Sequence, residues 1–160
     1  MDYWIDFSST MISQTVEYAL RAMVRLAELE PGQSLNSETL AMLTQAPAGY
    51  LSKVLRDLVV AGLVTSQRGP SGGFALARPA GQITMLDVVN AVDEIPRIRE
   101  CPLGNPAHVK LCPLHQRIDR ALDLVEREFR RTTLAEVVES GRKATDGCPA
   151  LIAPTIRKDG

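Results

Sequence analysis

The chain has 160 residues, 45% of them hydrophobic and 23% charged, with a formal net charge of −1. This length suits one domain with extensions, and the composition is that of an ordinary globular protein and excludes a disordered one. The charge gives no global sign of nucleic-acid binding, so any such site must be a local concentration of cations. No apolar run is long enough to cross a bilayer and the first residues lack a basic start, so we expect a cytoplasmic protein without membrane partners.

The first part of the chain predicts three helices in a row. Apolar residues at helical spacing predict a helix over residues 13–29, with Ser13 as its N-cap. A capping cluster begins a short helix over residues 36–45, and a third helix over residues 47–61 ends at Gly62. Two short helices joined by a tight turn are typical of a helix-turn-helix.

A β-hairpin is predicted directly after these helices. Two strand-like runs at residues 63–67 and 74–77 flank a segment rich in glycine and proline. A hairpin in this position is the wing of a winged helix-turn-helix. After a turn, Thr84 caps a helix that reaches Val92, and we expect this helix to complete the core.

Residues 93–110 have no clear period and predict a loop, after which Pro113 begins a long helix with one apolar stripe. The stripe consists of Leu114, Ile118, Leu122, Val125 and Phe129. A long helix outside a completed core packs either on a second copy of the chain, as the seam of a homodimer, or on its own domain. Thr133 caps a last short helix that ends at Val138, and the residues beyond are expected to be loose.

The predicted fold class is therefore mainly α with a small β-hairpin wing, arranged as a winged helix-turn-helix domain with a long dimerisation helix. The expected parts are an extension or alternative start (1–10), the DNA-binding domain (11–93), a ligand loop (94–111), the dimerisation helix with the short last helix (112–140), and a tail (141–160).

The candidate DNA contacts lie on the second helix of the pair and on the wing. Between residues 47 and 75 there are three cations against one anion, and base edges are read by side chains of such a helix while neighbouring groups hold phosphates. Arg68 would grip a phosphate or enter a minor groove, and backbone amides of the glycines allow close approach. The set is Tyr50, Ser52, Lys53, Arg56, Arg68, Gly69, Ser71, Gly72 and Gly73. Alternatively, the cations form a solvated face and the glycines only a turn.

The segments 50–64, 68–74 and 83–93 resemble the Rrf2 (IscR- and NsrR-like) family of bacterial transcription regulators, and the resemblance extends over about residues 11–138. It implies base and phosphate contacts from Tyr50, Ser52, Lys53 and Arg68. It also implies a homodimer that represses operons from a palindromic operator on double-stranded DNA. Chains of this family begin at the equivalent of Met11, so residues 1–10 are expected to be an appended arm or an alternative start.

Four of the five cysteine and histidine residues of the chain lie close together, at Cys101, His108, Cys112 and His115. Thiolates combined with imidazole are ligands for zinc or for an iron-sulfur cluster. Cys112 also lies at the start of a predicted helix, where the helix dipole favours a thiolate. The loop therefore predicts a soft-metal or redox site.

The family resemblance implies that this site holds an iron-sulfur cluster on Cys101, Cys112 and His115. The fourth ligand is then His108 or Glu17, the latter from either subunit. The middle cysteine of the family has no counterpart here, since its place falls near His108, and this departure favours a 2Fe-2S over a 4Fe-4S cluster.

Other interpretations stay open at this point. The loop cysteines are alternatively packed or free, with a switch based on thiol chemistry or a protein partner, and Glu17 is alternatively a surface carboxylate. Cys148 is a bystander or a redox-reactive thiol. A small zinc or electron-transfer protein on the same scaffold is a further class. No nucleophile-base pair, phosphate loop or paired carboxylates stand out, so we do not expect an enzyme.

Overall fold

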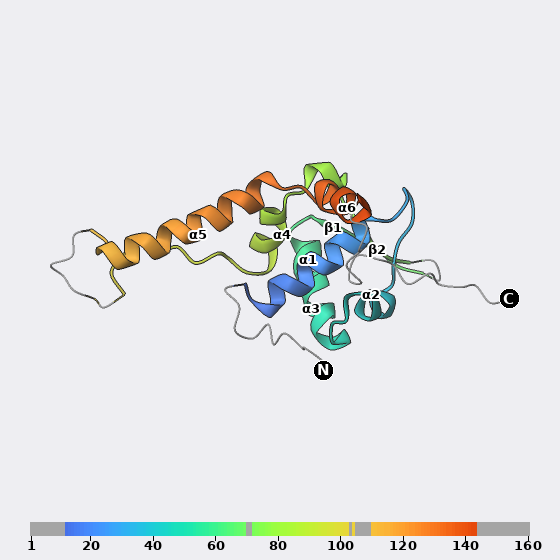
Figure 1. The fold of residues 1–160 in the computed structure, drawn as a ribbon. Helices are drawn as coiled ribbons and strands as arrows, with labels where there is room; N and C mark the ends of the chain where they lie inside the picture. Colours follow the sequence, from blue (N-terminus) through green and yellow to red (C-terminus); the bar gives the residue numbers. More distant parts are fainter. Residues whose placement is uncertain (1–11, 70–71, 103, 105–109, 144–160) are drawn as a thin grey trace, which may run out of the picture.

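The computed structural model describes residues 12–69, 72–102, 104 and 110–143, and it confirms the predicted mainly helical class with one hairpin (Figure 1). In chain order its elements are α1 (Gln14–Ala27), α2 (Ser37–Thr44), α3 (Ala48–Val60), β1 (Val64–Gln67), β2 (Gly73–Leu76), the short 3-10 helix η2 (Ala80–Gln82), α4 (Met85–Val92), α5 (Pro113–Arg131) and α6 (Leu134–Lys143). None of the helices in these described ranges is both long and apolar enough to span a bilayer.

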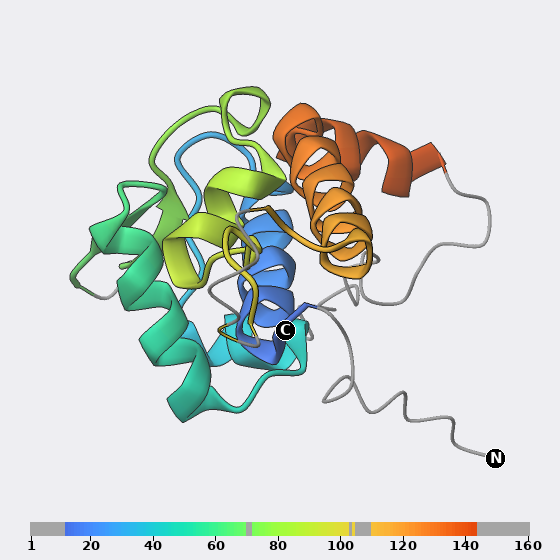
Figure 2. The ribbon, with the colours of Figure 1, turned by 90° about the vertical axis from the view of Figure 1, so that its left-hand side faces the viewer.

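Helix α1 is the centre of the core, and α2, α3, α4 and α6 pack against it (Figure 2). Its beginning is fixed as predicted, because the Ser13 side chain accepts a hydrogen bond of 3.3 Å from the Val16 amide. Small and long apolar side chains alternate on its inner face, where Ala19, Ala22 and Met23 are fully buried. Neighbouring helices therefore approach α1 closely at the alanines and interlock with it at the methionine.

The helix-turn-helix consists of α2 and α3. The Asn36 side chain caps α2 through the Thr39 amide at 2.8 Å, and α2 ends at Gln45, whose φ of 54° places it in the left-handed region. Helix α3 buries one face, which carries Leu51, Val54, Leu55 and Leu58. The opposite face of α3 is exposed to solvent.

The wing contains one more strand contact than the sequence predicted. Strands β1 and β2 pair antiparallel, with Val64 opposite Leu76. Leu35, in the segment before α2, adds a bridge to Phe74, and the two residues exchange backbone hydrogen bonds of 3.0 and 2.8 Å. This bridge ties the wing to the helix-turn-helix, and it brings the Leu35 carbonyl so near that a Cβ at Gly73 would lie 2.6 Å from its oxygen.

Helix α4 begins with a capping box in which Thr84 and Asp87 satisfy each other's backbone amides. Helix α6 continues to Lys143, beyond the expected end at Val138, and a salt bridge between Glu139 and Lys143 lies on its last turn. These residues are polar, so they contribute nothing to the apolar period from which the end of the helix was predicted.

Helix α5 projects from the body of the molecule, and its N-terminal end lies at the outer tip (Figure 1). The C-terminal half of its stripe packs on the domain, where Leu122 is buried and Val125 and Phe129 are half-buried. The N-terminal half does not, because Leu114 is 64% exposed and Ile118 is 41% exposed. The C-terminal half therefore follows the alternative of packing on its own domain, whereas packing of the N-terminal half on a second copy stays a prediction.

Candidate DNA-binding surface and cysteine-histidine loop

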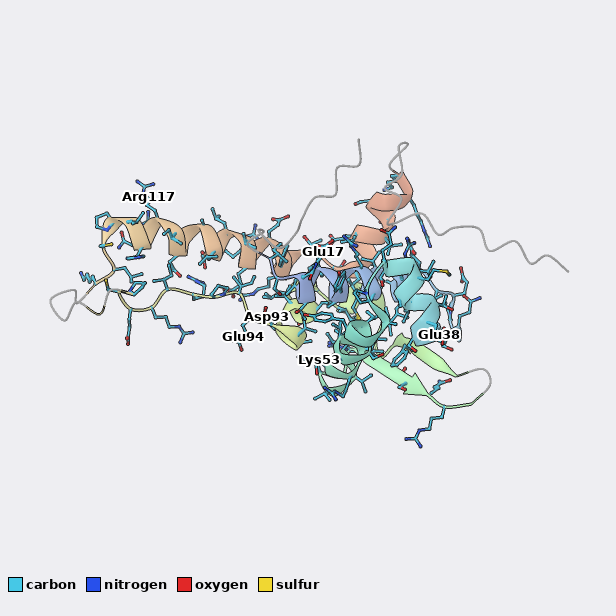
Figure 3. All side chains as sticks on the ribbon, turned by 90° about the horizontal axis from the view of Figure 1, so that it is seen from below. Glu17, Glu38, Lys53, Asp93, Glu94 and Arg117 are labelled. Atoms are coloured by element: carbon cyan, nitrogen blue, oxygen red, sulfur yellow. The ribbon has the colours of Figure 1, made fainter. Side chains whose placement is uncertain are left out.

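The outer face of α3 presents Ser52, Lys53 and Arg56, all of which are exposed. Figure 3 shows Lys53 at the surface of the body, on the side opposite α6. The Ser52 hydroxyl donates a hydrogen bond of 2.9 Å to the Ala48 carbonyl, so this hydroxyl has its acceptor capacity free for a ligand. The structure thus places these three predicted side chains together on one accessible helix face.

Tyr50 is anchored to α1 and is not simply a surface side chain. Its hydroxyl is hydrogen-bonded to the Thr15 hydroxyl, and its ring meets Tyr18 edge-on with the centroids 5.7 Å apart. The side chain is nonetheless 40% exposed. Tyr50 therefore connects the beginning of α3 to α1 and keeps part of its ring available for contact.

In the wing, Arg68 and Gly69 are exposed, and Gly69 adopts a φ of 115° that favours glycine. The Gly72 amide donates to the Gly69 carbonyl at 2.9 Å, so it is engaged within the turn. A Cβ at Gly72 would lie 2.4 Å from the Gln67 carbonyl oxygen. The geometry thus gives Gly72, like the buried Gly73, a role in the shape of the wing. The predicted contact Ser71 lies outside the described residues.

Two of the predicted ligands come together at the outer tip of the molecule. Cys112 is the N-cap residue of α5, Pro113 takes the first helical position, and the Cys112 Sγ lies 3.2 Å from His115 Nδ1. Cys101 is half-buried on the segment that leads to this tip, and its carbonyl accepts a hydrogen bond from Gly104. In the part of the chain that the structure describes, no three His, Cys, Asp or Glu side chains converge at metal-ligand distances. His108 and Cys148 fall outside that part.

Glu17 lies on the body of the molecule, whereas Arg117, which marks the outer part of α5, lies far from it (Figure 3). The Glu17 carboxylate accepts a hydrogen bond of 2.9 Å from Arg21 Nε. Arg21 in turn donates at 3.2 Å to the Thr44 carbonyl, one of the last carbonyls of α2. Glu17 therefore does not complete a ligand set with Cys112 of its own chain, and ligation by Glu17 requires a second copy.

The structure adds a charged cluster that the sequence did not predict. Arg97 binds both Asp119 oxygens, with Nε and Nη2 at 2.8 and 2.9 Å, and its Nη1 lies 3.0 Å from Asp123 and 3.1 Å from Glu126. The Ile98 amide donates to the same Asp119 at 3.0 Å. We call Arg97 with Asp119, Asp123 and Glu126 the carboxylate clasp. The three acids follow one face of α5, but nothing local to them indicated a cation from the loop as their partner.

These hydrogen bonds shift the ionisation of the carboxylate clasp. The bonds from Arg97, followed by the bond from the Ile98 amide, lower the pKa of Asp119 to about 2. The bonds to Asp119 and Glu126 raise the pKa of Arg97 in return. The Asp119 carboxylate and the Arg97 guanidinium therefore both stay charged at neutral pH.

The comparison with protein families decides where the chain belongs. The Rrf2 model, described as an iron-dependent transcriptional regulator, matches residues 12–140. The chain belongs to the Rrf2 family. This confirms the resemblance seen in the sequence, and the chain is accordingly a DNA-binding transcriptional regulator with a winged helix-turn-helix.

Relatives and solved structures agree with this assignment. A Mycobacterium tuberculosis protein described as an HTH-type transcriptional regulator is 34% identical over 128 residues, which cover 79% of this chain and 80% of the relative. One from Aquifex aeolicus is 28% identical over 142 residues, with 83% and 94% covered.

Among solved structures, CymR, the global cysteine regulator of B. subtilis, matches with a TM-score of 0.68 and 25% identity, covering 81% of this chain and 96% of its own. IscR of T. potens matches with a TM-score of 0.69 at 21% identity, covering 92% and 95%. The likeness to IscR supports the fold alone.

Proposed function

We propose that this chain acts as a homodimeric repressor that reads a palindromic operator, with α3 of each protomer in a major groove and the wing against the adjacent backbone. The observation that supports this proposal is the outer face of α3, where Ser52, Lys53 and Arg56 are exposed opposite a completely buried apolar face. A lysine or arginine on such a helix pairs with guanine edges or with phosphates.

The contacts divide by function. Lys53 and Arg56 lie one helical turn apart and would reach neighbouring positions of one groove. Tyr50 would use its exposed ring edge while its hydroxyl stays on Thr15. Arg68 at the wing would hold a phosphate or the minor groove, which adds affinity without reading the sequence directly.

Binding to a duplex from the chain's own promoter region, measured over a series of salt concentrations, tests this proposal. We expect Lys53→Ala and Arg56→Ala to weaken binding to the best site by about 1–3 kcal/mol and to relax base preference. Arg68→Ala should weaken all duplexes alike and lower the salt slope by about 1.

Arg142→Ala is the matched control, because this arginine is exposed on α6, away from α3. The proposed interface would be contradicted if Lys53→Ala, Arg56→Ala and Arg68→Ala all bound DNA with wild-type affinity. It would also be contradicted if Arg142→Ala lost as much affinity as they did. Wild-type protein without salt-dependent binding to any duplex would favour the alternative of a zinc or electron-transfer protein.

The second part of the proposal concerns the switch. Cys101, Cys112 and His115 would hold an iron-sulfur cluster, 2Fe-2S in preference to 4Fe-4S, with His108 or Glu17 of the partner subunit as the fourth ligand. The donor chemistry fits, since the Cys112 thiol and the His115 imidazole already lie 3.2 Å apart at the N-terminus of α5, and both are ligand types of such clusters. A bound cluster would supply one-electron redox chemistry and sensitivity to oxidants.

The residues of the chain explain how such a site can affect DNA binding. The ligands lie at the tip of α5, and the exposed half of the α5 stripe is the proposed seam between protomers. A change in the loop therefore alters the packing of one protomer on the other, and with it the spacing of the two α3 helices.

Protein purified without oxygen provides the test of the switch. We expect visible absorption, iron and sulfide, and operator affinity that changes when the cluster is removed. A coloured protein whose DNA affinity does not respond to cluster removal would contradict the switch. A colourless, metal-free protein with specific DNA binding that responds to oxidants would favour the alternative thiol switch, for which Cys112 beside His115 is the candidate.

A further inference from the structure

The carboxylate clasp joins two segments that are far apart in the sequence. Residues 97 and 98 lie in the first part of the ligand loop, shortly after α4, while Asp119 lies in the second turn of α5. The segment runs alongside α5 toward the tip in Figures 1 and 3. Asp119 accepts two hydrogen bonds from the Arg97 guanidinium and one from the Ile98 amide, so it fixes both a side chain and the backbone of the crossing segment.

Of the three acids in the clasp, Asp119 is the one that Arg97 binds at both carboxylate oxygens. Asp123 has a second cation in Arg127, and Glu126 has one in Arg130, each one turn further along α5. Asp119 has the bidentate pairing with Arg97, and the arginine fork matches the two carboxylate oxygens in a way that an ammonium group does not. The contact therefore fixes a position and an orientation, not only a charge.

The contact at Asp119 is also the point from which both cysteines lead toward the tip. Cys101 follows Ile98 by three residues, which would span about 10 Å in an extended chain. Cys112 precedes Asp119 by seven residues, which span about 10 Å in a helix. Since the segment and the helix both run from the clasp to the tip, we expect the two cysteines to lie at about the same height along α5.

From this register we propose that Arg97 and Asp119 are the positioning residues of the ligand loop, which bring Cys101 level with Cys112 and His115. The inference rests on the proposed function, in which these three residues are ligands. Without the clasp, Cys112 and His115 stay together on α5 because they are neighbours on one helix. Cys101, in contrast, is no longer held beside them. The clasp thus controls one ligand out of three.

Binding of Co²⁺ to the metal-free full-length protein tests this inference. Co²⁺ is used because the intensity of its thiolate charge-transfer absorption reports how many cysteines bind, and Cys148→Ser in every variant leaves only the two loop thiols. We expect Arg97→Ala to bind at least about tenfold more weakly, with absorption of one thiolate in place of two. Arg97→Lys, which keeps the charge and loses the fork, should lie between Arg97→Ala and the wild-type residue.

Arg127→Ala is the matched control, because Arg127 pairs with the Asp123 side chain of the same clasp and donates to the Asp123 carbonyl, both within α5. It should keep both the affinity and the two-thiolate absorption. Equal effects in Arg97→Ala and Arg127→Ala, or Arg97→Ala with wild-type affinity and two thiolates bound, would overturn the positioning role.

Amide hydrogen exchange at Ile98 in the same metal-free proteins supplies a readout that does not involve a metal. We expect this amide to lose protection in Arg97→Ala and in Asp119→Leu, whose side chain is of similar size and accepts no hydrogen bond, and to keep it in Arg127→Ala. Unchanged protection in the first two overturns the inference. Should Arg97→Ala fail to fold by circular dichroism, Asp119→Leu decides both measurements.

A wild-type protein that binds no Co²⁺ through thiolates would refute the ligand set, and with it the positioning of Cys101. The exchange at Ile98 would then still show whether the clasp holds the segment, and binding to DNA would be untouched. The failure of the proposed interface, by contrast, appears only in the DNA measurements, so the two failures are distinguishable.

Discussion

Asp119 shows at the scale of one residue how the loop depends on charge. Its pKa in the folded protein is about 2, below the ordinary value of 3.8, so folding favours the ionised form. The stabilisation is present above about pH 4 and is lost as the pH falls toward 2. We expect an NMR titration of the Asp119 carboxyl to give a midpoint near 2, and Arg97→Ala to move it upward.

Glu136 provides the internal control for that titration. The amide and hydroxyl of Thr133 lower its pKa, and neither group belongs to the clasp. Its midpoint should therefore be the same with and without Arg97. An Asp119 midpoint that does not move in Arg97→Ala would show that the guanidinium is not the cause of the shift.

Two glycines should respond oppositely to a methyl group. Gly73→Ala places a Cβ 2.6 Å from the Leu35 carbonyl oxygen, and the backbone must separate to admit it, which we expect to cost about 1–3 kcal/mol. Gly49→Ala meets nothing within 4 Å in the first turn of α3 and should stabilise the protein by about 0.5–1 kcal/mol. Urea unfolding measures the change in the free energy of unfolding for both variants. Changes of the same sign would contradict the prediction.

The sequence could predict residues whose partners are near in the chain. Ser13, Asn36 and Thr84 bind amides three residues away, so their roles as caps were visible in short windows. Arg97 and Gly73 meet partners 22 and 38 residues away, and no local pattern identifies such a pair. The cysteine-histidine loop lies between these cases, because the sequence showed its donors but not the clasp that positions one of them.

At the scale of an element, the beginning of α4 is fixed by side-chain caps and by backbone hydrogen bonds. Thr84 and Asp87 form the capping box, and backbone bonds from Met85 to Thr132 and from Leu134 to Ile83 connect this point to the junction of α5 and α6. We expect Thr84→Ala to cost about 1 kcal/mol. Because the two side chains act together, the double variant Thr84→Ala with Asp87→Ala should cost less than the sum of the single ones.

Urea denaturation of the four proteins of this cycle measures the coupling. Additive costs would mean that the two members of the box act independently. The prediction of α4 from its cap and apolar spacing was confirmed at both ends. Helix α6 was predicted too short, because its last turn is polar and carries a salt bridge in place of buried apolar residues.

At the scale of the whole molecule, the proposed DNA-binding surface lies apart from the proposed ligand site. The helix-turn-helix and wing lie in the body, while Cys112 and His115 lie at the outer tip of α5 (Figure 1). The sequence predicted the order of these parts and the one apolar stripe on α5. It did not predict that this stripe divides, because the point at which α5 leaves the body depends on the packing of α4 against it.

The exposed half of α5 leads to the last prediction, which concerns the homodimer. Leu114 and Ile118 are 64% and 41% exposed on this half, and each buried aliphatic side chain contributes about 1.5–3 kcal/mol to association. Ile118→Glu should therefore weaken the dimer about tenfold or more in analytical ultracentrifugation, while Val60→Glu, 83% exposed on α3, leaves it intact. Since a palindrome is bound tightly only when both α3 helices engage it together, Ile118→Glu should also reduce operator affinity to that of a half-site. An Ile118→Glu protein that remains dimeric would place the seam elsewhere.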